Sequence, residues 1–335
     1  MGSCHPPSPV GTGDGTWIVT QAEAFHSSFT HIMIGSKRNA SDIPTDWTRS
    51  GKRRQRWDEL FSSLPRSQNA IDSNSMVDDL PRTLKQQLRA YIIDRCPGSA
   101  ELADVLFWIA ENFPRQLRTK ELCETLESFT LIGADINSLL SKEKDPTGDR
   151  KKNMVIYDLA CGHALGGLLL SYRFSSIRVI CIDKEERQCW STYRDGFEKF
   201  GKKANDDDSS VTANVSFVVG DITSDCFQPK SGDYLMCLHG CNELSPFVLT
   251  KARSINTGYG IMPCCIRDGM LGVTTASSHN NWSIVNDIAR YSIHVGYLAG
   301  KFGVEKIAAI SQLITNRFLI LIGDYKSGDV VMIAK

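Results

Sequence analysis

The sequence lacks an excess of charge of either sign. It carries 38 Lys and Arg residues against 38 Asp and Glu residues, so the net charge is zero. This balance excludes the global positive field of proteins that cling to nucleic acid or anionic membrane, although a local basic face is compatible with it. No run of 18 apolar residues occurs, so we expect no transmembrane helix. The N-terminus also lacks the charged start and apolar core of a secretory signal.

The 11 cysteines contain no Cys-x-x-Cys pair, so the sequence gives no reason to expect a structural metal site. Their odd number does not suggest a disulfide framework. Cys181, Cys237 and Cys264 lie inside apolar runs, where buried and reduced thiols are expected. These features are typical of an intracellular protein.

Residues 1–75 show little hydrophobic periodicity and are rich in Pro, Gly, Ser and Thr, which predicts a disordered or irregular arm. The basic cluster Gly51–Arg56 is interpreted first as a solvated charge run. An organelle transit peptide and an RNA-contacting arm are the alternatives. We therefore expect a cytoplasmic protein, with the mitochondrion or the plastid as the alternative through this arm.

Helical spacing dominates residues 76–145. Leu80, Leu84, Leu88 and Ile92 fall on one face of a predicted helix. Two more helices are expected, one over Ala100–Asn112 and one opened by Pro114. We predict that this segment is a helical cap in front of a larger domain, residues 150–335, which a charged linker separates from it.

Strand-like and helical patterns alternate from Met154 onward, which is typical of an α/β protein with a mainly parallel sheet and helices on both faces. The last two strands are spaced as a hairpin. The strands are predicted at 154–157, 177–182, 215–219, 234–238, 259–262, 304–310 and 317–322, with helices at 189–200, 244–256 and 284–302.

The stretch Met154–Ser171 predicts a strand, a tight turn and the start of a helix. The strand ends in Asp158, and the turn Ala160-Cys161-Gly162 is made of small residues that let a ligand approach the backbone. A second strand ends in Asp183, near the spacing at which an acid holds a ribose diol in nucleotide-binding βαβ units. An ordinary βαβ unit with a surface Asp is the alternative.

The turn lacks the G-x-G-x-x-G fingerprint of dinucleotide sites. It has the pattern Asp158-x-Ala160-x-Gly162-x-Ala164-x-Gly166 instead. This pattern resembles the first motif of S-adenosylmethionine-dependent methyltransferases, D/E-x-G-x-G-x-G, in which the acid-bearing turn faces the methionine part of the cofactor. Since alanine replaces two of the glycines, we expect a negative φ at Ala160 and Ala164.

Polar or small residues follow the other strands, and the carboxyl ends of parallel strands meet at one rim. Asp221 could accept a hydrogen bond from an adenine amine while Ile222 packs on the ring, and Gly240 would allow close backbone approach. His239, Asn242 and Glu243 are candidates for orienting or deprotonating a methyl acceptor. A buried imidazole at His239 and a helix-terminal charge at Glu243 are the alternatives.

Cys264 and Cys265 follow Pro263 at the end of a strand. One hypothesis is that one of these thiols is a nucleophile, as in pyrimidine C5 methylation. No Lys or His lies nearby in the sequence to lower the pKa of such a thiol. Packing is favoured.

Three segments together resemble a eukaryotic group of methyltransferase-domain proteins: DLACGHALGG at Asp158–Gly167, HGCNE at His239–Glu243 and MPCC at Met262–Cys265. More distantly they are similar to tRNA ribose methyltransferases and methyltransferase-like proteins. The resemblance implies a Rossmann-like seven-stranded sheet with an antiparallel last strand. It also implies methyl transfer from S-adenosyl-L-methionine, with RNA (tRNA-like) or a small molecule as acceptor. A non-catalytic scaffold that keeps the cofactor fold is the alternative.

Overall fold

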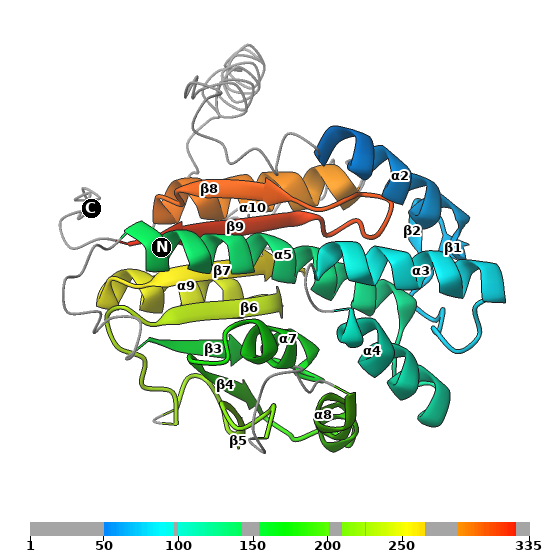
Figure 1. The fold of residues 1–335 in the computed structure, drawn as a ribbon. Coiled ribbons are helices and arrows are strands. Elements are labelled where there is room, and N and C mark those ends of the chain that lie inside the picture. Colours follow the sequence, from blue (N-terminus) through cyan, green and yellow to red (C-terminus); the bar gives the residue numbers. More distant parts are fainter. Residues whose placement is uncertain are drawn as a thin grey trace, which may run out of the picture. The chain divides into compact units, whose positions relative to one another are not determined.

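The computed structural model describes residues 50–96, 100–142, 154–200, 210–224, 226–264 and 287–325 (Figure 1). The chain divides into two units, Met1–Arg54 and Gln55–Lys335. Only the last residues of the first unit are described, as the start of a helix, so the account that follows concerns the second unit.

Seven strands form one sheet in the order β5-β4-β3-β6-β7-β9-β8. The strands β3 to β7 pair in parallel, whereas β9 is antiparallel to both β7 and β8. This order, with β9 inserted antiparallel between β7 and β8, is the Rossmann-like sheet of class I methyltransferases, and it confirms the predicted fold class. The strands are β3 (Val155–Leu159), β4 (Arg178–Asp183), β5 (Val215–Val219), β6 (Tyr234–Gly240), β7 (Gly258–Pro263), β8 (Lys306–Ala309) and β9 (Leu319–Asp324).

Alternate side chains of the central strands enter two different cores, because successive residues of a strand point to opposite faces. Ile156 and Tyr234 belong to the core that α5 (Thr119–Lys142), α7 (Leu165–Arg173) and α8 (Cys189–Phe200) cover. Tyr157 and Leu235 belong to the core under α9 (Leu244–Ile255) and α10 (Asp287–Phe302). Figure 1 shows α5 and α7 on one side of the sheet and α9 and α10 on the other.

The helices that precede the sheet do not have a core of their own. Buried residues of α3 (Arg82–Arg95) and α4 (Glu101–Asn112) share the core on the α7 face of the sheet. The third helix, α5, begins at Thr119 and not at Pro114 as expected. Arg115, with φ of 65°, has a left-handed backbone that a helix cannot continue through.

The expected irregular arm is corrected over its last part. Ser50–Ser63 forms helix α2, and a short hairpin of β1 (Arg66–Ser67) and β2 (Ala70–Ile71) follows it. Trp57 and Phe61 of α2 are buried, and both rings meet the Tyr91 ring edge-on at 5.3 and 5.2 Å. The spacing of Trp57 and Phe61, four residues apart, is typical of one face of a helix. The basic cluster Gly51–Arg56 beside them is instead typical of a solvated segment, and this is why the helix was not predicted. Residues 1–49 of the expected arm lie outside the described part of the chain.

No helix in the described ranges has both the length and the apolar character needed to cross a bilayer.

Candidate functional site

A cavity of about 460 Å³ opens at the carboxyl ends of the parallel strands. This volume lies within the range of small-molecule and cofactor sites, and the position is the one at which doubly wound sheets bind ligands. Helix α5 supplies the opposite wall. The lining residues are Ser73, Lys120, Glu121, Glu124, Thr125, Asp158, Ala160, Cys161, Gly162, His163, Gly166, Asp183, Arg187, Leu238, His239, Cys241, Cys264, Thr315 and Arg317.

The turn after β3 has a left-handed backbone at three alternate positions. The φ angles are 51° at Ala160, 58° at Gly162 and 58° at Ala164. The expectation of negative φ at the two alanines is therefore wrong. The chain folds this turn with the backbone that glycine takes readily, although alanine is strained in it.

Asp183 links the turn to the second strand. Its Oδ2 accepts a hydrogen bond of 2.8 Å from the backbone N–H of Gly162, and its Oδ1 accepts one of 2.7 Å from the N–H of Lys184. Because each carboxylate oxygen has a further lone pair, the Asp183 side chain can still accept hydrogen bonds from a ligand in the cavity.

Asp158 is a buried acid of the site, with 2% of its surface exposed. Its Oδ2 accepts a 2.8 Å hydrogen bond from the N–H of Gly167 in the first turn of α7. Burial raises the pKa of Asp158 to about 7; the Gly167 N–H opposes the rise and the charge of Asp183 adds to it. A Cβ on Gly167 would lie 2.3 Å from the Cys181 sulfur and 3.1 Å from Asp158 Oδ2, so this close packing requires glycine.

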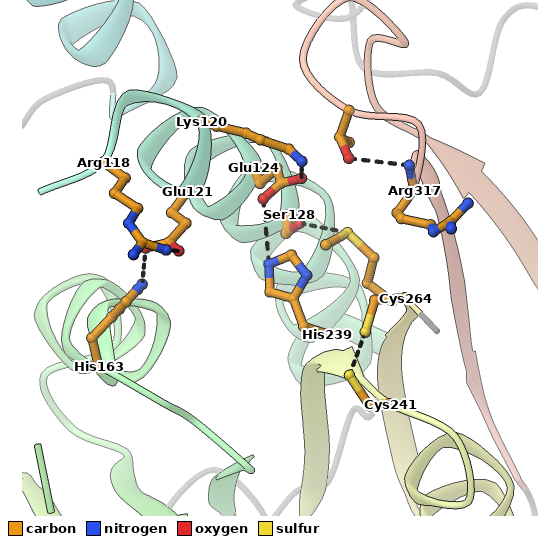
Figure 2. Close-up of polar contacts among 12 residues, drawn as sticks. Arg118, Lys120, Glu121, Glu124, Ser128, His163, His239, Cys241, Cys264 and Arg317 are labelled. Atoms are coloured by element: carbon orange, nitrogen blue, oxygen red, sulfur yellow. Dashed lines mark hydrogen bonds and ion pairs between the residues drawn. The ribbon is translucent and has the colours of Figure 1, made fainter. Parts of the chain in front are cut away.

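His239 and Glu124 face each other across the cavity (Figure 2). The distance from His239 Nε2 to Glu124 Oε2 is 3.4 Å, and Lys120 Nζ lies 3.9 Å from the other carboxylate oxygen. The Glu124 side chain is 4% exposed and that of His239 is 40% exposed. A buried carboxylate that holds a more exposed imidazole is an arrangement suited to proton transfer, because the carboxylate fixes the orientation of the ring.

A second histidine–glutamate pair lies one turn earlier on α5. His163 Nε2 lies 3.4 Å from Glu121 Oε2, and Arg118 also pairs with Glu121 at 3.0 Å. Although burial acts to raise it, the pKa of Glu121 is held at about 2 by His163 and Arg118. Glu121 is therefore a fixed anion that positions His163 beside the turn.

The structure brings only part of the predicted site together. The predicted residues that line the cavity are Asp158, Ala160, Cys161, Gly162, Asp183 and His239, and those that do not are Asp221, Ile222, Gly240, Asn242 and Glu243.

Asp221 has partners at the protein surface instead. Its Oδ1 accepts hydrogen bonds from the N–H and the hydroxyl of Thr223, at 2.9 and 2.8 Å, and its Oδ2 pairs with Lys184 Nζ at 3.1 Å. These bonds, first that of the Thr223 N–H, lower the pKa of Asp221 to about 2. Ile222 beside it is buried in the α9-side core. The adenine contact assigned to this pair stays a prediction that the cavity lining does not support.

The residues after His239 support the start of α9. A Cβ on Gly240 would lie 2.7 Å from Ser245 Oγ, so the close approach at Gly240 is to the protein's own helix. Glu243 occupies the N-cap of α9 without a side-chain capping hydrogen bond, a position at which its charge favours the helix dipole. Asn242 has φ of 50°. Cys265 lies outside the described residues.

Glu124 and Glu121 are the site residues that the sequence did not reveal. They lie on α5, remote in sequence from the strand ends, and only their i, i+3 spacing on an amphipathic helix hinted at a shared face. Among residues with described positions, no three His, Cys, Asp or Glu side chains group as metal ligands would.

Comparison with protein-family models and with curated protein sequences gives no match. Solved structures align at low identity. The pyocyanin biosynthetic protein PhzM aligns at 16% identity and a TM-score of 0.33, over 52% of this chain and 51% of that one, so this chain spans about half of PhzM. An O-methyltransferase family protein from Burkholderia thailandensis aligns at 13% identity with a TM-score of 0.34. The alignment covers 95% of this chain and 100% of that one. The 16S rRNA methyltransferase KamB aligns at 13% identity with a TM-score of 0.32, over 55% of this chain and 94% of that one. Since these TM-scores are below 0.5, the strand order itself defines the fold class.

Proposed function

We propose that this protein transfers a methyl group from S-adenosyl-L-methionine. The observation that carries the proposal is the pair Asp158 and Asp183, which end neighbouring parallel strands and line the same cavity. Two carboxylates beside a small-residue turn fit a ligand that has a positively charged sulfur and ammonium group together with a ribose diol. Asp183 would hold the ribose, and Asp158 with the Ala160–Gly162 turn would face the methionine part.

The bound cofactor supplies a methyl group on a sulfonium that is already activated for transfer. The chain's own residues have the remaining tasks, which are to align an acceptor, to exclude water and to take a proton from the acceptor. His239, held by Glu124 at 3.4 Å, is the residue of the cavity best placed for the proton. We assign it as general base and Glu124 as the residue that orients it.

The proposed acceptor is RNA, which the likeness of HGCNE and MPCC to tRNA methyltransferases supports, and a small molecule is the alternative. The experiment is incubation of the protein with labelled S-adenosylmethionine and separate pools of RNA, protein and metabolites. Label in the RNA pool would support RNA as the acceptor. Label in the metabolite pool alone would show that the acceptor is a small molecule instead. Calorimetry with S-adenosylmethionine, and with NAD as the comparison ligand, tests the cofactor independently.

A non-catalytic binding module is the second candidate. The strained alanines at 160 and 164, where glycine would be unstrained, favour it. Binding of S-adenosylmethionine without methyl transfer to any pool would support this second function.

A further inference from the structure

Cys241 and Cys264 each follow the last residue of neighbouring parallel strands. Gly240 of β6 and Pro263 of β7 are opposite each other in the register, so the two cysteines are the next residues along both strands. Neighbouring strands lie about 4.8 Å apart, which is inside the Cα separation of about 4.4–6.8 Å that a disulfide requires. The fold therefore places both backbones where a disulfide can form without rearrangement.

The two side chains point toward each other. The sulfur atoms of Cys241 and Cys264 are 2.7 Å apart, and Figure 2 shows them in contact beneath His239. Ordinary non-bonded heavy atoms lie about 3.5–4.0 Å apart. Only a small rotation of either side chain separates this contact from a bond.

The backbone at Cys241 is anchored. Its carbonyl accepts a 3.0 Å hydrogen bond from the N–H of Leu244 at the start of α9, and Ser245 Oγ donates a 2.7 Å hydrogen bond to the carbonyl of Gly240. Because α9 holds this segment, the backbone position of Cys241 is fixed by the fold rather than by the thiol contact itself.

Both cysteines line the cavity, so a small solute can reach them. By contrast, four of the cysteines within the described ranges are buried: Cys96, Cys123, Cys181 and Cys237. The exposed Cys226 has the Ser224 hydroxyl and the Asp221 carbonyl as neighbours, each at 3.2 Å from its sulfur.

We propose that Cys241 and Cys264 form a reversible dithiol–disulfide site that reacts with small-molecule disulfides. One thiol loses its proton, and its thiolate attacks a sulfur of the small disulfide, forming a mixed disulfide and releasing one small thiolate. The second cysteine, as thiolate, then attacks the mixed disulfide and releases the second small thiolate. The protein loses two electrons and two protons, and the small disulfide becomes two thiols.

The bond would join the ends of β6 and β7 on the wall beside His239, whereas Asp158 and Asp183 lie at the carboxyl ends of β3 and β4. This disulfide is independent of the proposed methyl transfer, because it can be measured without any cofactor or acceptor. Cross-linking also restricts the unfolded chain, so the oxidised protein is expected to melt several degrees above the reduced one.

The experiment is a titration of the full-length protein in glutathione buffers, from fully reduced to fully oxidised, at pH 8. Intact mass spectrometry after thiol alkylation should show the loss of two alkylatable thiols in one step, without retained glutathione. Addition of dithiothreitol should restore them. Peptide mapping of the wild-type protein should join the peptides that contain Cys241 and Cys264.

Three single variants sharpen the assignment. Cys241→Ser and Cys264→Ser should each abolish the cross-link, whereas Cys265→Ser should keep it and so separate the two adjacent cysteines. An unchanged thiol count in oxidised glutathione would overturn the proposal. A cross-link that survives in Cys241→Ser, or one that joins Cys161 to Cys181, would overturn it as well. Since the wild-type mapping needs no variant, a variant that fails to fold does not affect the test.

Discussion

The backbone N–H of Gly162 donates a 2.8 Å hydrogen bond to Oδ2 of Asp183. This bond joins the turn after β3 to the end of β4, so the acid at the second strand helps to shape the loop at the first. The Asp183 side chain is therefore held in place before a ligand binds, so less side-chain entropy is lost on binding.

Asp183→Ala should weaken S-adenosylmethionine binding on the order of 100-fold or more, because two charge-assisted hydrogen bonds to the ribose are lost. Calorimetry measures the affinity, and circular dichroism checks that the fold is retained. Asp221→Ala is the matched control, since the Asp221 carboxylate bonds to Thr223 and Lys184 and does not line the cavity. Equal losses in the two variants would show that Asp183 is not the ribose ligand.

Ala160→Gly should stabilise the protein by about 0.5–1 kcal/mol. Glycine removes the strain of a left-handed alanine, and its greater freedom in the unfolded chain offsets part of the gain. Thermal unfolding should show a melting temperature about 2 °C higher. Ala299→Gly in the interior of α10 is the control, and it should destabilise by about 1 kcal/mol. A loss of stability in Ala160→Gly would contradict the left-handed backbone at φ of 51°.

Glu124→Gln and His239→Gln should each lower methyl transfer on the order of 100-fold, because each disrupts the pair that accepts the acceptor's proton. The dissociation constant for S-adenosylmethionine should stay nearly unchanged. The double variant should be little worse than either single variant, since the two residues act as one unit. Asn137→Ala, at an exposed position of α5 that does not line the cavity, is the control for general damage to the helix. Additive losses would separate the roles of Glu124 and His239.

His294 should make the fold sensitive to acid. It is 1% exposed, and neither ring nitrogen has a hydrogen-bond partner. Burial lowers its pKa below the ordinary value, so the unfolded state binds its proton first as the pH falls. The free energy of unfolding should thus decrease below about pH 6.5. In His294→Leu, urea unfolding at several pH values should show a flatter dependence. Parallel curves for the two proteins would exclude His294 as a cause.

The fold could be predicted from the sequence because strands and helices alternate in it, and because the central strands β3, β6 and β7 are apolar runs that are buried at nearly every position. β5 at Val215–Val219 and α8 at Cys189–Phe200 have the bounds that the pattern predicts. Asp158 and Asp183 could be predicted as site residues because ligands bind at the carboxyl ends of parallel strands, and both acids lie at the end of an apolar strand.

Other features depend on tertiary contacts that local sequence does not encode. Alanine disfavours a positive φ, so the turn at Ala160 was predicted the wrong way; packing of β3 against α7 and the Asp183 bond override that preference. Glu124 meets His239 only because α5 crosses the rim of the sheet. Asp221 lies just beyond the end of β5, but the nearby Lys184 and Thr223 satisfy its carboxylate outside the cavity.

The most direct measurement is the affinity for S-adenosylmethionine between pH 6 and 8. The pKa of Asp158 is about 7, and a bound cation favours the ionised carboxylate, so the association constant should rise with pH by up to about tenfold per unit below that pKa. Asp158→Asn should bind more weakly and lose this dependence, and any titration of the ligand's own amino group is common to both proteins. Failure of the folded wild-type protein to bind, or identical pH profiles in the two proteins, would contradict the account.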